Sequence, residues 1–344
     1  MSTPIYAKMA VIGCGLIGSS VIRAARAAGA VGEVAVFDAS EAARARVVEL
    51  GYADTVTDNA ADACRGADLV VFAVPPMAMG DAARAAAPGV GPGVTVTDVG
   101  SVKAAVAQAL AEALPDTCFI IPGHPIAGTE QSGPDAGFAE LFQNRWTILT
   151  PQTPPPAPYQ AAADTPYQAA LERLTEFWTA MGANVELMDA AHHDLVLAVT
   201  SHLPHLIAYN IVGTAADLEG VTQGEVMKYS AGGFRDFTRI ASSDPTMWRD
   251  VFLNNRDAVL EMLGRFGEDL AALQRLVRYG DGEGLFDLFT RTRAIRWGEG
   301  DKLFELFSRT RDIRRGIIAA GQDSADSNFG RDKRPPETSD TKSQ

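Results

Sequence analysis

Cysteines, long apolar runs and an export signal are scarce or missing in this 344-residue sequence. Its 3 cysteines, Cys14, Cys64 and Cys118, lie far apart without CxxC or metal-ligand spacing. We therefore expect reduced, buried thiols, as in an intracellular protein, rather than a disulfide framework. No apolar run reaches about 18 residues, so we expect no membrane-spanning helix. The first residues lack the basic and apolar segments of a secretory signal, and we expect a cytoplasmic protein.

Positive charge is also in short supply. Lys and Arg number 30 against 43 Asp and Glu, which gives a formal net charge of -13. Nucleic acids and anionic membranes bind basic surfaces, so we expect neither as a partner. A small anionic ligand stays possible, because it needs only a few local cations. At this length, 47% hydrophobic and 21% charged residues are typical of a globular protein with two domains.

The first half of the chain alternates short β-rich runs with Ala-rich helical patterns. We predict strands at 9–15, 32–38, 68–74, 94–100 and 118–123, with helices at 16–28 and 41–50. Strands that alternate with helices predict right-handed crossovers and a mostly parallel sheet, which makes this half a doubly wound α/β domain.

Proline marks the end of this pattern. Residues 151–166 are so rich in proline that we predict a surface loop. A helix at 167–181 and a strand at 183–189 follow, and beyond them only helical patterns occur. The predicted domains are an α/β domain at 1–188, an all-α domain at 189–320 and a disordered polar tail at 321–344.

A glycine motif identifies the ligand of the first domain. Gly13, Gly15 and Gly18 form GxGxxG between a predicted strand and a predicted helix, and Asp38 ends the next strand. The glycines allow a tight turn and close approach of a pyrophosphate to the helix N-terminus, which indicates a Rossmann-type dinucleotide site. Asp38 would bind ribose hydroxyls and repel a 2'-phosphate, which favours NAD over NADP. Predicted cofactor contacts also include Leu16, Ile17, Val74 and Pro75.

His124 is the best candidate for a general base among the 5 histidines. It follows the predicted strand 118–123, and the carboxyl ends of such strands face the ligand crevice. An ordinary pKa near 6.5 suits proton transfer from a hydroxyl. The alternative is that His124 is a loop histidine that only forms a hydrogen bond with the backbone. Ser101 precedes a helix and could be its N-cap, a ligand contact, or both.

The second domain carries two further pairs. His202 and His205 are three residues apart, but no third ligand accompanies them, so we predict no metal site. Arg235 and Arg239 are four residues apart and could bind a carboxylate with two guanidinium forks, or could form surface ion pairs.

Together, GCGLIGSS, DVGSVK, GHPIAGTEQSG, SHLPH and GGFRDFTRIASSDPTMWRD resemble the prephenate/arogenate (cyclohexadienyl) dehydrogenases of tyrosine biosynthesis. The resemblance runs from about Lys8 to residue 320. It implies a Rossmann-type domain followed by a helical dimerisation domain, hence a homodimer. It also implies oxidative decarboxylation of prephenate to 4-hydroxyphenylpyruvate, or of arogenate to tyrosine, with NAD.

The resemblance further implies roles for single residues. His124 would accept the proton of the ring C4 hydroxyl while hydride passes to the nicotinamide, and Ser101 would hydrogen-bond near both. Arg239 would bind a substrate carboxylate. The rest of the substrate pocket would be formed by Arg235, His205, Trp248, Thr129 and Glu130.

Two other functions stay open beside this one. A β-hydroxyacid dehydrogenase of similar build relies on a catalytic lysine, but no lysine lies between Lys103 and Lys228. A catalytically silent NAD-binding sensor would lack a coherent set of catalytic side chains, whereas His124, Ser101 and Arg239 occur together here. The sequence does not decide between prephenate and arogenate.

Overall fold

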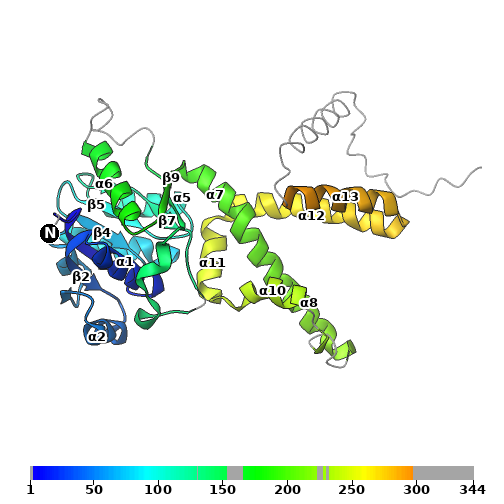
Figure 1. The fold of residues 1–344 in the computed structure, drawn as a ribbon, viewed down its shortest axis with the longest axis horizontal. Coiled ribbons are helices and arrows are strands. Elements are labelled where there is room, and N and C mark those ends of the chain that lie inside the picture. The colour runs from blue at the N-terminus through cyan, green and yellow to red at the C-terminus, as the bar shows by residue number, and fades with distance from the viewer. Residues whose placement is uncertain (1–2, 130, 153–165, 223–227, 230–231, 297–344) are drawn as a thin grey trace, which may run out of the picture. The chain divides into compact units, whose positions relative to one another are not determined.

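The computed structural model describes residues 3–129, 131–152, 166–222, 228–229 and 232–296 (Figure 1). Its N-terminal part contains a six-stranded parallel sheet with strand order β3-β2-β1-β4-β5-β6. The strands are β1 (Tyr6–Ile12), β2 (Val31–Phe37), β3 (Thr55–Val56), β4 (Leu69–Phe72), β5 (Thr95–Asp98) and β6 (Phe119–Ile120). The strand order reverses between β1 and β4, and such sheets bind ligands at the strand ends beside this point.

Helices connect these strands, as the alternating pattern predicts. They are α1 (Leu16–Ala27), α2 (Glu41–Leu50), α3 (Ala60–Cys64), α4 (Met79–Ala86), α5 (Ala104–Ala113) and α6 (Pro166–Ala180). The helix predicted at 41–50 is confirmed residue for residue. The Ser40 side chain accepts a hydrogen bond from Ala43 N, and Gly51 ends the helix with a φ of 66°. Short 3-10 helices lie at Pro76–Ala78, Ala87–Gly89, Pro134–Ala136 and Ala139–Phe142.

One predicted strand is wrong in a way that matters for the site. Residues 118–123 do not form a single strand: β6 ends at Ile120, and β7 (Gly123–Pro125) belongs to a second sheet. Pro122 stands between them and has no N–H with which to continue a ladder. In the second sheet β7 pairs antiparallel with β8 (Trp146–Leu149), which pairs parallel with β9 (Asn184–Leu187). His124 therefore lies within a strand, opposite Ile148, and not in a loop.

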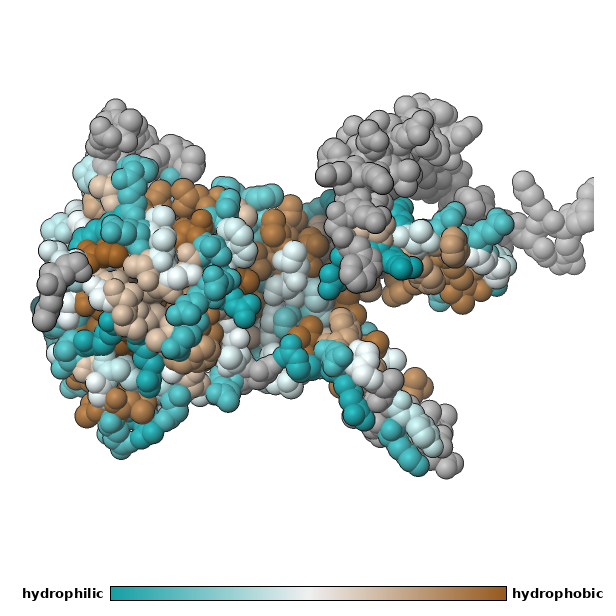
Figure 2. Space-filling view, in the orientation of Figure 1, coloured by the Kyte–Doolittle hydropathy of each residue, from teal (hydrophilic) through white to brown (hydrophobic). Residues whose placement is uncertain are grey.

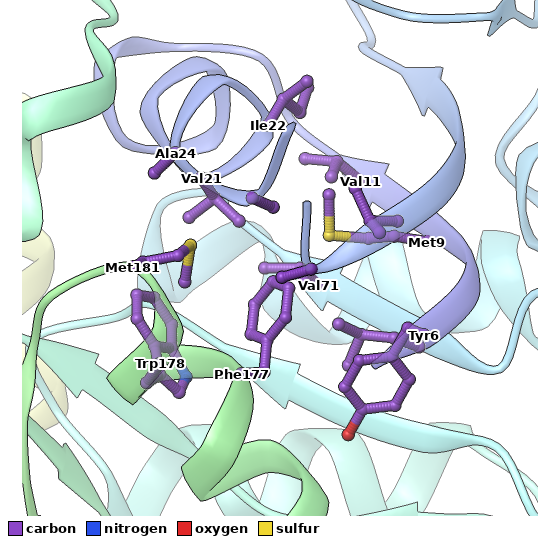
Figure 3. Close-up of a cluster of buried hydrophobic side chains, with 14 of the residues drawn as sticks. Tyr6, Met9, Val11, Val21, Ile22, Ala24, Val71, Phe177, Trp178 and Met181 are labelled. Atoms are coloured by element: carbon purple, nitrogen blue, oxygen red, sulfur yellow. The ribbon is translucent and has the colours of Figure 1, made fainter. Parts of the chain in front are cut away.

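The core lies on both faces of the six-stranded sheet. Met9 and Val11 point to one face, where they pack with Val71 and with Phe177 and Trp178 of α6 (Figure 3). The alternate residues of the same strands point to the other face, among them Ala10, Ile12, Val70 and Phe72. Burial of a large apolar side chain stabilises a fold by about 1.5–3 kcal/mol, so this double-faced core holds the strand ends in place.

Within the described residues, only helices follow β9. They are α7 (Ala190–Leu197), a π-helical turn (Ala198–His202), α8 (Leu203–Thr222), α10 (Gly232–Thr238), a 3-10 turn (Arg239–Ser242), α11 (Pro245–Asn254), α12 (Arg256–Tyr279) and α13 (Gly282–Arg296). The fold class is thus an α/β Rossmann-type domain followed by a helical region.

The contacts divide the chain into two compact units, 1–265 and 266–344. The first unit contains both sheets and the helices from α1 to α11. The domain limits predicted at 188, 320 and 344 stay predictions. Most of the proline-rich loop at 151–166 and the whole tail at 321–344 lie outside the described residues.

One helical stretch of the described chain meets the length and composition expected of a membrane span. It covers Ala190–Leu218, and 22% of its most apolar window is buried inside the protein. The expectation that no such stretch exists is therefore wrong by this criterion, because a helix can reach a high mean hydropathy without an unbroken apolar run. The stretch contains the buried polar residues His193, Asp194 and His202, of which His193 and Asp194 contact the α/β domain as described below.

The second unit, which begins within α12, exposes apolar side chains on the later part of that helix and on α13. Figure 2 shows hydrophobic residues along α12 and α13. In the described part of this unit, residues 266–296, the exposed large apolar side chains belong to Leu270, Val277, Phe286, Phe289 and Ile295, and also to Tyr279. An exposed apolar stripe of this kind is typical of a surface that another protein covers.

Candidate active site

The glycine turn after β1 has the backbone geometry that a dinucleotide needs. Gly13 has a φ of 96°, and a Cβ there would lie 2.5 Å from the Ala73 carbonyl oxygen. A Cβ on Gly18 would lie 2.1 Å from the Gly13 oxygen. At Gly15, in contrast, a Cβ would meet nothing within 4 Å. Gly13 and Gly18 thus allow the turn to pack closely, while Gly15 leaves open space for a ligand next to the backbone.

The N-terminus of α1 faces this open side of the turn. Gly15 is its N-cap residue, with no side-chain cap, and the first turn of the helix has no acidic residue. Leu16 and Ile17 begin the helix here, and the first N–H groups of a helix with no cap favour an anion. Val74 lies beside the turn, since its Cγ1 is 2.9 Å from the Cβ position on Gly13, and Pro75 is exposed. These residues fit a bound pyrophosphate.

Asp38 stands at the end of β2, where a ribose would lie. Its carboxylate accepts hydrogen bonds from Cys14 N at 2.7 Å and from Ser40 N at 2.8 Å. A cation that the sequence prediction did not consider lies close by: Arg44 Nη1 donates to the Asp38 carbonyl oxygen at 2.7 Å. The carboxylate is therefore fixed next to the glycine turn, but Arg44 reduces the negative potential around it.

The His124 side chain is joined to two residues that the sequence analysis did not select. His124 Nδ1 lies 2.9 Å from His193 Nε2, and His193 Nδ1 lies 2.8 Å from Asp194 Oδ1. His124 is 9% exposed and His193 is fully buried. Burial, together with the charges of His193, Lys103 and His202, lowers the pKa of His124 well below its ordinary value of 6.5. His124 is therefore a neutral imidazole at neutral pH.

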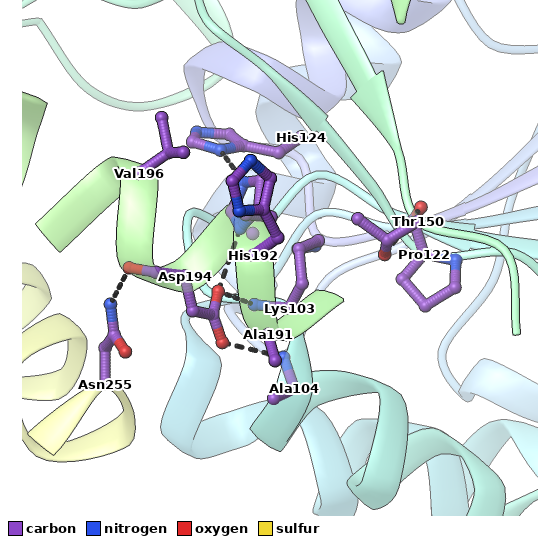
Figure 4. A network of polar contacts seen from close by, with 12 residues as sticks. Lys103, Ala104, Pro122, His124, Thr150, Ala191, His192, Asp194, Val196 and Asn255 are labelled. Atoms are coloured by element: carbon purple, nitrogen blue, oxygen red, sulfur yellow. Dashed lines mark hydrogen bonds and ion pairs between the residues drawn. The ribbon is translucent and has the colours of Figure 1, made fainter. Parts of the chain in front are cut away.

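Asp194 also caps α5, from about 90 residues away in the chain. Its carboxylate accepts hydrogen bonds from Lys103 N at 2.7 Å and Ala104 N at 2.9 Å (Figure 4). Burial would raise the pKa of Asp194, but the hydrogen bonds from His193, Ala104 and Lys103 lower it below its ordinary value. The N-cap role considered for Ser101 is thus wrong, because Lys103 holds the cap position and Asp194 supplies the acceptor. Ser101 is half-buried two residues before it.

A buried ion pair lies beside the His124 strand. The Lys103 ammonium contacts the Asp98 carboxylate at the end of β5, and it donates to the Gly123 carbonyl oxygen at 2.6 Å. Gly123 N in turn donates to Asp98 Oδ1 at 3.2 Å. Burial raises the pKa of Asp98 and lowers that of Lys103, and their mutual attraction opposes both shifts. These contacts tie β5 and β7 together next to His124.

A second group of aromatic and cationic side chains comes from the helical region. His205 stacks on Trp248 of α11 with ring centroids 3.6 Å apart, and His202 lies edge-on to Trp248 at 6.1 Å. Burial and the nearby Arg239 charge lower the pKa of His205. Asn255 Nδ2 donates both to His202 Nδ1 and to the Asp194 carbonyl oxygen, so this second group is linked to Asp194, whose carboxylate holds His193 beside His124.

Two buried N–H groups in this second group have no hydrogen-bond acceptor within the described part of the chain. Asn255 Nδ2 donates to His202 Nδ1 at 3.1 Å, so the hydrogen of the neutral ring is on Nε2. Neither that Nε2 nor the Trp248 Nε1 has a partner. A buried donor without an acceptor costs about 1–3 kcal/mol, which a ligand oxygen would recover.

Other predicted site residues are not joined to this group by a contact between described residues. Arg235 on α10 and Thr129 after β7 are both exposed. Glu130 lies outside the described residues. The described residues also hold no cluster of three potential metal ligands.

The residues that sequence reasoning missed are His193, Asp194 and Asn255, while His202 was considered only as a metal ligand. Their signal was weak, because a buried His-Asp pair and a lone Asn look like ordinary helix residues in one sequence. The only hint is that the pair precedes SHLPH on the same helical stretch.

Comparison with known families agrees with the geometry of both regions. Residues 21–187 match the family model "prephenate dehydrogenase, nucleotide-binding domain", and residues 189–291 match "prephenate dehydrogenase, dimerization domain". The chain belongs to the prephenate dehydrogenase family. The glycine turn at Gly13 to Gly18 lies just before the first match.

Relatives within this family cover most of the chain. It is 45% identical over 285 residues to the cyclohexadienyl dehydrogenase of Zymomonas mobilis, covering 83% of this chain and 93% of the relative. It is 31% identical over 278 residues to the prephenate dehydrogenase of Bacillus subtilis, covering 80% of this chain and 72% of the relative.

Solved structures of the family have the same fold. The prephenate dehydrogenase of Aquifex aeolicus, in complex with hydroxyphenyl propionate and NAD+, aligns with a TM-score of 0.76 at 31% identity. The alignment covers 86% of this chain and 98% of that one. The arogenate dehydrogenase of Synechocystis aligns with a TM-score of 0.70 at 25% identity, covering 84% and 98%.

Proposed function

We propose that this member of the prephenate dehydrogenase family catalyses the NAD-dependent oxidative decarboxylation of prephenate, arogenate or both. The observation that carries the proposal is the buried, neutral His124 beside the carboxyl end of β5, with a carboxylate-linked imidazole at its Nδ1. Family membership and NAD+ in the Aquifex aeolicus structure support the same reaction.

The cofactor is held by the glycine turn. Gly13, Gly15 and Gly18 form the turn, and the N–H groups of Leu16 and Ile17 bind the pyrophosphate. Asp38 accepts hydrogen bonds from the ribose hydroxyls, which favours NAD. The remaining contacts come from Val74, Pro75 and Ser101. When bound there, NAD accepts a hydride from the substrate ring.

His124 is the general base of the reaction. Its neutral ring accepts the proton of the ring C4 hydroxyl at Nε2, since Nδ1 faces His193. Ser101 hydrogen-bonds the same hydroxyl and holds it in place. A well-placed base contributes about 100- to 10,000-fold in rate. The buried surroundings exclude water from the proton transfer.

The helical region binds the anionic end of the substrate. Arg239 binds a substrate carboxylate, while His205 and Trp248 form the apolar and hydrogen-bonding wall. Arg235, Thr129 and Glu130 complete the pocket. A dianionic substrate is compatible with the net charge of -13, because that charge is spread over the chain while the arginines act locally.

The helical region also forms a homodimer in the cytoplasm. This part of the proposal rests on the dimerization-domain match and on the exposed apolar residues Ile211, Val212 and Leu218 of α8. A dimer that covers this face of α8 explains why so apolar a helix is mostly unburied in one copy of the chain.

The test is a two-by-two assay of the purified protein. NAD and NADP are each combined with prephenate and with arogenate, and reduced cofactor is followed by its absorbance. We expect turnover with NAD and at least one of the two substrates. His192→Asn is the matched control, because His192 is an exposed histidine next to His193, and it should keep full turnover. No turnover in any combination, with NAD binding intact, would contradict the proposal.

A further inference from the structure

The contacts around His193 define where the protons of the two imidazoles lie. Asp194 is a carboxylate that can only accept, so His193 Nδ1 carries a hydrogen. The Nε2 of a neutral His193 is then a lone pair, and it accepts the hydrogen on His124 Nδ1 at 2.9 Å. This leaves His124 Nε2 without a hydrogen, which is the tautomer that a general base needs.

We propose that His193 is the second imidazole of a proton relay: it takes over the proton that His124 removes from the substrate and holds it beside Asp194. The inference rests on the proposed function and deepens it. In this relay His124 touches the substrate, and His193 and Asp194 act through it.

Each proton transfer in the relay is balanced. The substrate O–H bond breaks as an N–H bond forms at His124 Nε2, and the His124 Nδ1–H bond breaks as one forms at His193 Nε2. C4 is oxidised and NAD is reduced, as in the proposed function. When carbon dioxide leaves, the electrons of the broken C–C bond end on the ring oxygen, which takes the proton back by the same route. No proton is gained or lost overall.

The electrostatic surroundings place the stored positive charge on His193. Lys103 contacts the His124 strand through Gly123, so its ammonium opposes a charge on His124. Asp98 is paired with Lys103. His193 has the Asp194 carboxylate at 2.8 Å, whereas no described carboxylate contacts the His124 ring.

Hydrogen bonds fix the position of Asp194 in the relay. The α5 amides of Lys103 and Ala104 donate to its two oxygens, and Asn255 Nδ2 donates to its carbonyl oxygen at 2.7 Å. The acceptor of the relay is therefore fixed by two other segments of the chain, the start of α5 and Asn255. Helix N-terminal amides stabilise the ionised form of a carboxylate, so Asp194 remains charged while His193 gains and loses a proton.

Replacing His193 with Gln separates proton storage from orientation. A glutamine oxygen can accept the hydrogen bond from His124 Nδ1, but it cannot take up a proton. We expect His193→Gln to lower kcat about 10- to 100-fold, with KM for substrate and NAD and the thermal midpoint near wild type. His193→Phe, which also removes the acceptor, should lower kcat further. His192→Asn should match wild type.

The number of moving protons gives a readout that a structural role would not change. In mixtures of H2O and D2O, a plot of the wild-type kcat against the fraction of D2O should be curved, because two protons move together. In His193→Gln the dependence should become linear. Wild-type kcat together with an unchanged curve in His193→Gln would overturn the relay.

An NMR measurement decides the proton arrangement without any assay of activity. In protein labelled with 15N-histidine, the wild type should show hydrogen on Nδ1 of both His124 and His193, with signals assigned from the variants. Hydrogen on His124 Nε2 in the resting enzyme would overturn the proposal. If the wild type turned over neither substrate, the proposed function would fail while this spectrum still tested the tautomers.

Discussion

The cofactor turn and the histidine cluster are built in opposite ways. The turn is made of neighbours: Gly13, Gly15 and Gly18 lie within six residues, and their roles follow from backbone geometry. The cluster joins His124 to His193, 69 residues later, and Lys103 to Asp194, 91 residues later. A local site needs the right backbone and little else. A site assembled over such distances depends on every packed element that separates its parts.

The largest expected effect comes from replacing His124, the general base in the histidine cluster. His124→Asn should lower kcat by about 100- to 10,000-fold, because the proton acceptor is lost. NAD binding should persist, since no part of the glycine turn changes. Turnover and cofactor binding by fluorescence measure the two regions separately. Near-normal turnover would remove His124 from the role of base.

The glycine turn can be broken in two distinct ways. Gly18→Ala places a Cβ 2.1 Å from backbone and should destabilise the fold by several kcal/mol, on the order of a severe core substitution. Gly15→Ala meets no protein atom, so the thermal midpoint should hold while the NAD affinity falls about 10-fold or more. Thermal melts and NAD titrations distinguish the two. Equal loss of stability in both variants would contradict the assignment of Gly15 to the ligand.

Lowering the pH should destabilise the histidine cluster before it affects the glycine turn. Burial lowers the pKa of His202 to about 4, so the folded state binds fewer protons than the unfolded state between about 6.5 and 4. Its contribution, on the order of 3 kcal/mol, is full above pH 6.5 and is lost as the pH falls toward 4. Denaturant unfolding across this range measures the loss. The plot of unfolding free energy against pH should be flatter in His202→Asn. An equal slope in both proteins would contradict the assignment of this pH dependence to His202.

Carboxylate binding is expected to depend on Arg239. Arg239→Ala should raise the KM for substrate about 10- to 100-fold, with a smaller change in kcat, because a charge-assisted hydrogen bond contributes about 1.5–3 kcal/mol. Steady-state kinetics measure this, with Arg265→Ala as a control, since Arg265 is exposed and pairs with Glu261 one turn earlier on α12. An unchanged KM would place the carboxylate elsewhere.

The smallest effect should be on cofactor choice. Asp38→Ala should weaken the preference against NADP by about 10-fold, because the carboxylate that repels a 2'-phosphate is gone and Arg44 remains. The ratio of kcat/KM for NAD and NADP is the measurement. Adding Arg44→Ala to this variant should restore much of the preference for NAD over NADP. If neither change moves the ratio, another residue selects the cofactor.

Sequence reasoning succeeded where structure is local. The alternation of strands and helices, the glycine turn and Asp38 follow from patterns a few residues long, and α2 was placed to the residue. It failed where a distant segment decides the outcome. Ser101 was a reasonable N-cap from its neighbours alone, but Asp194 occupies that role from another helix. The placement of His124 in a second sheet likewise depends on β8, which pairs with it from 24 residues later.

The cap on α5 bears on the order in which the newly made chain can become a finished enzyme. Until residue 194 has left the ribosome, Lys103 and Ala104 lack their acceptor and His193 is not yet there to meet His124. The α/β domain can collapse earlier with the His124 strand paired to β8, yet the first turn of α5 and the His124 ring wait for the helical region. A fragment cut at residue 188 would therefore carry an intact cofactor turn beside an unfinished catalytic corner.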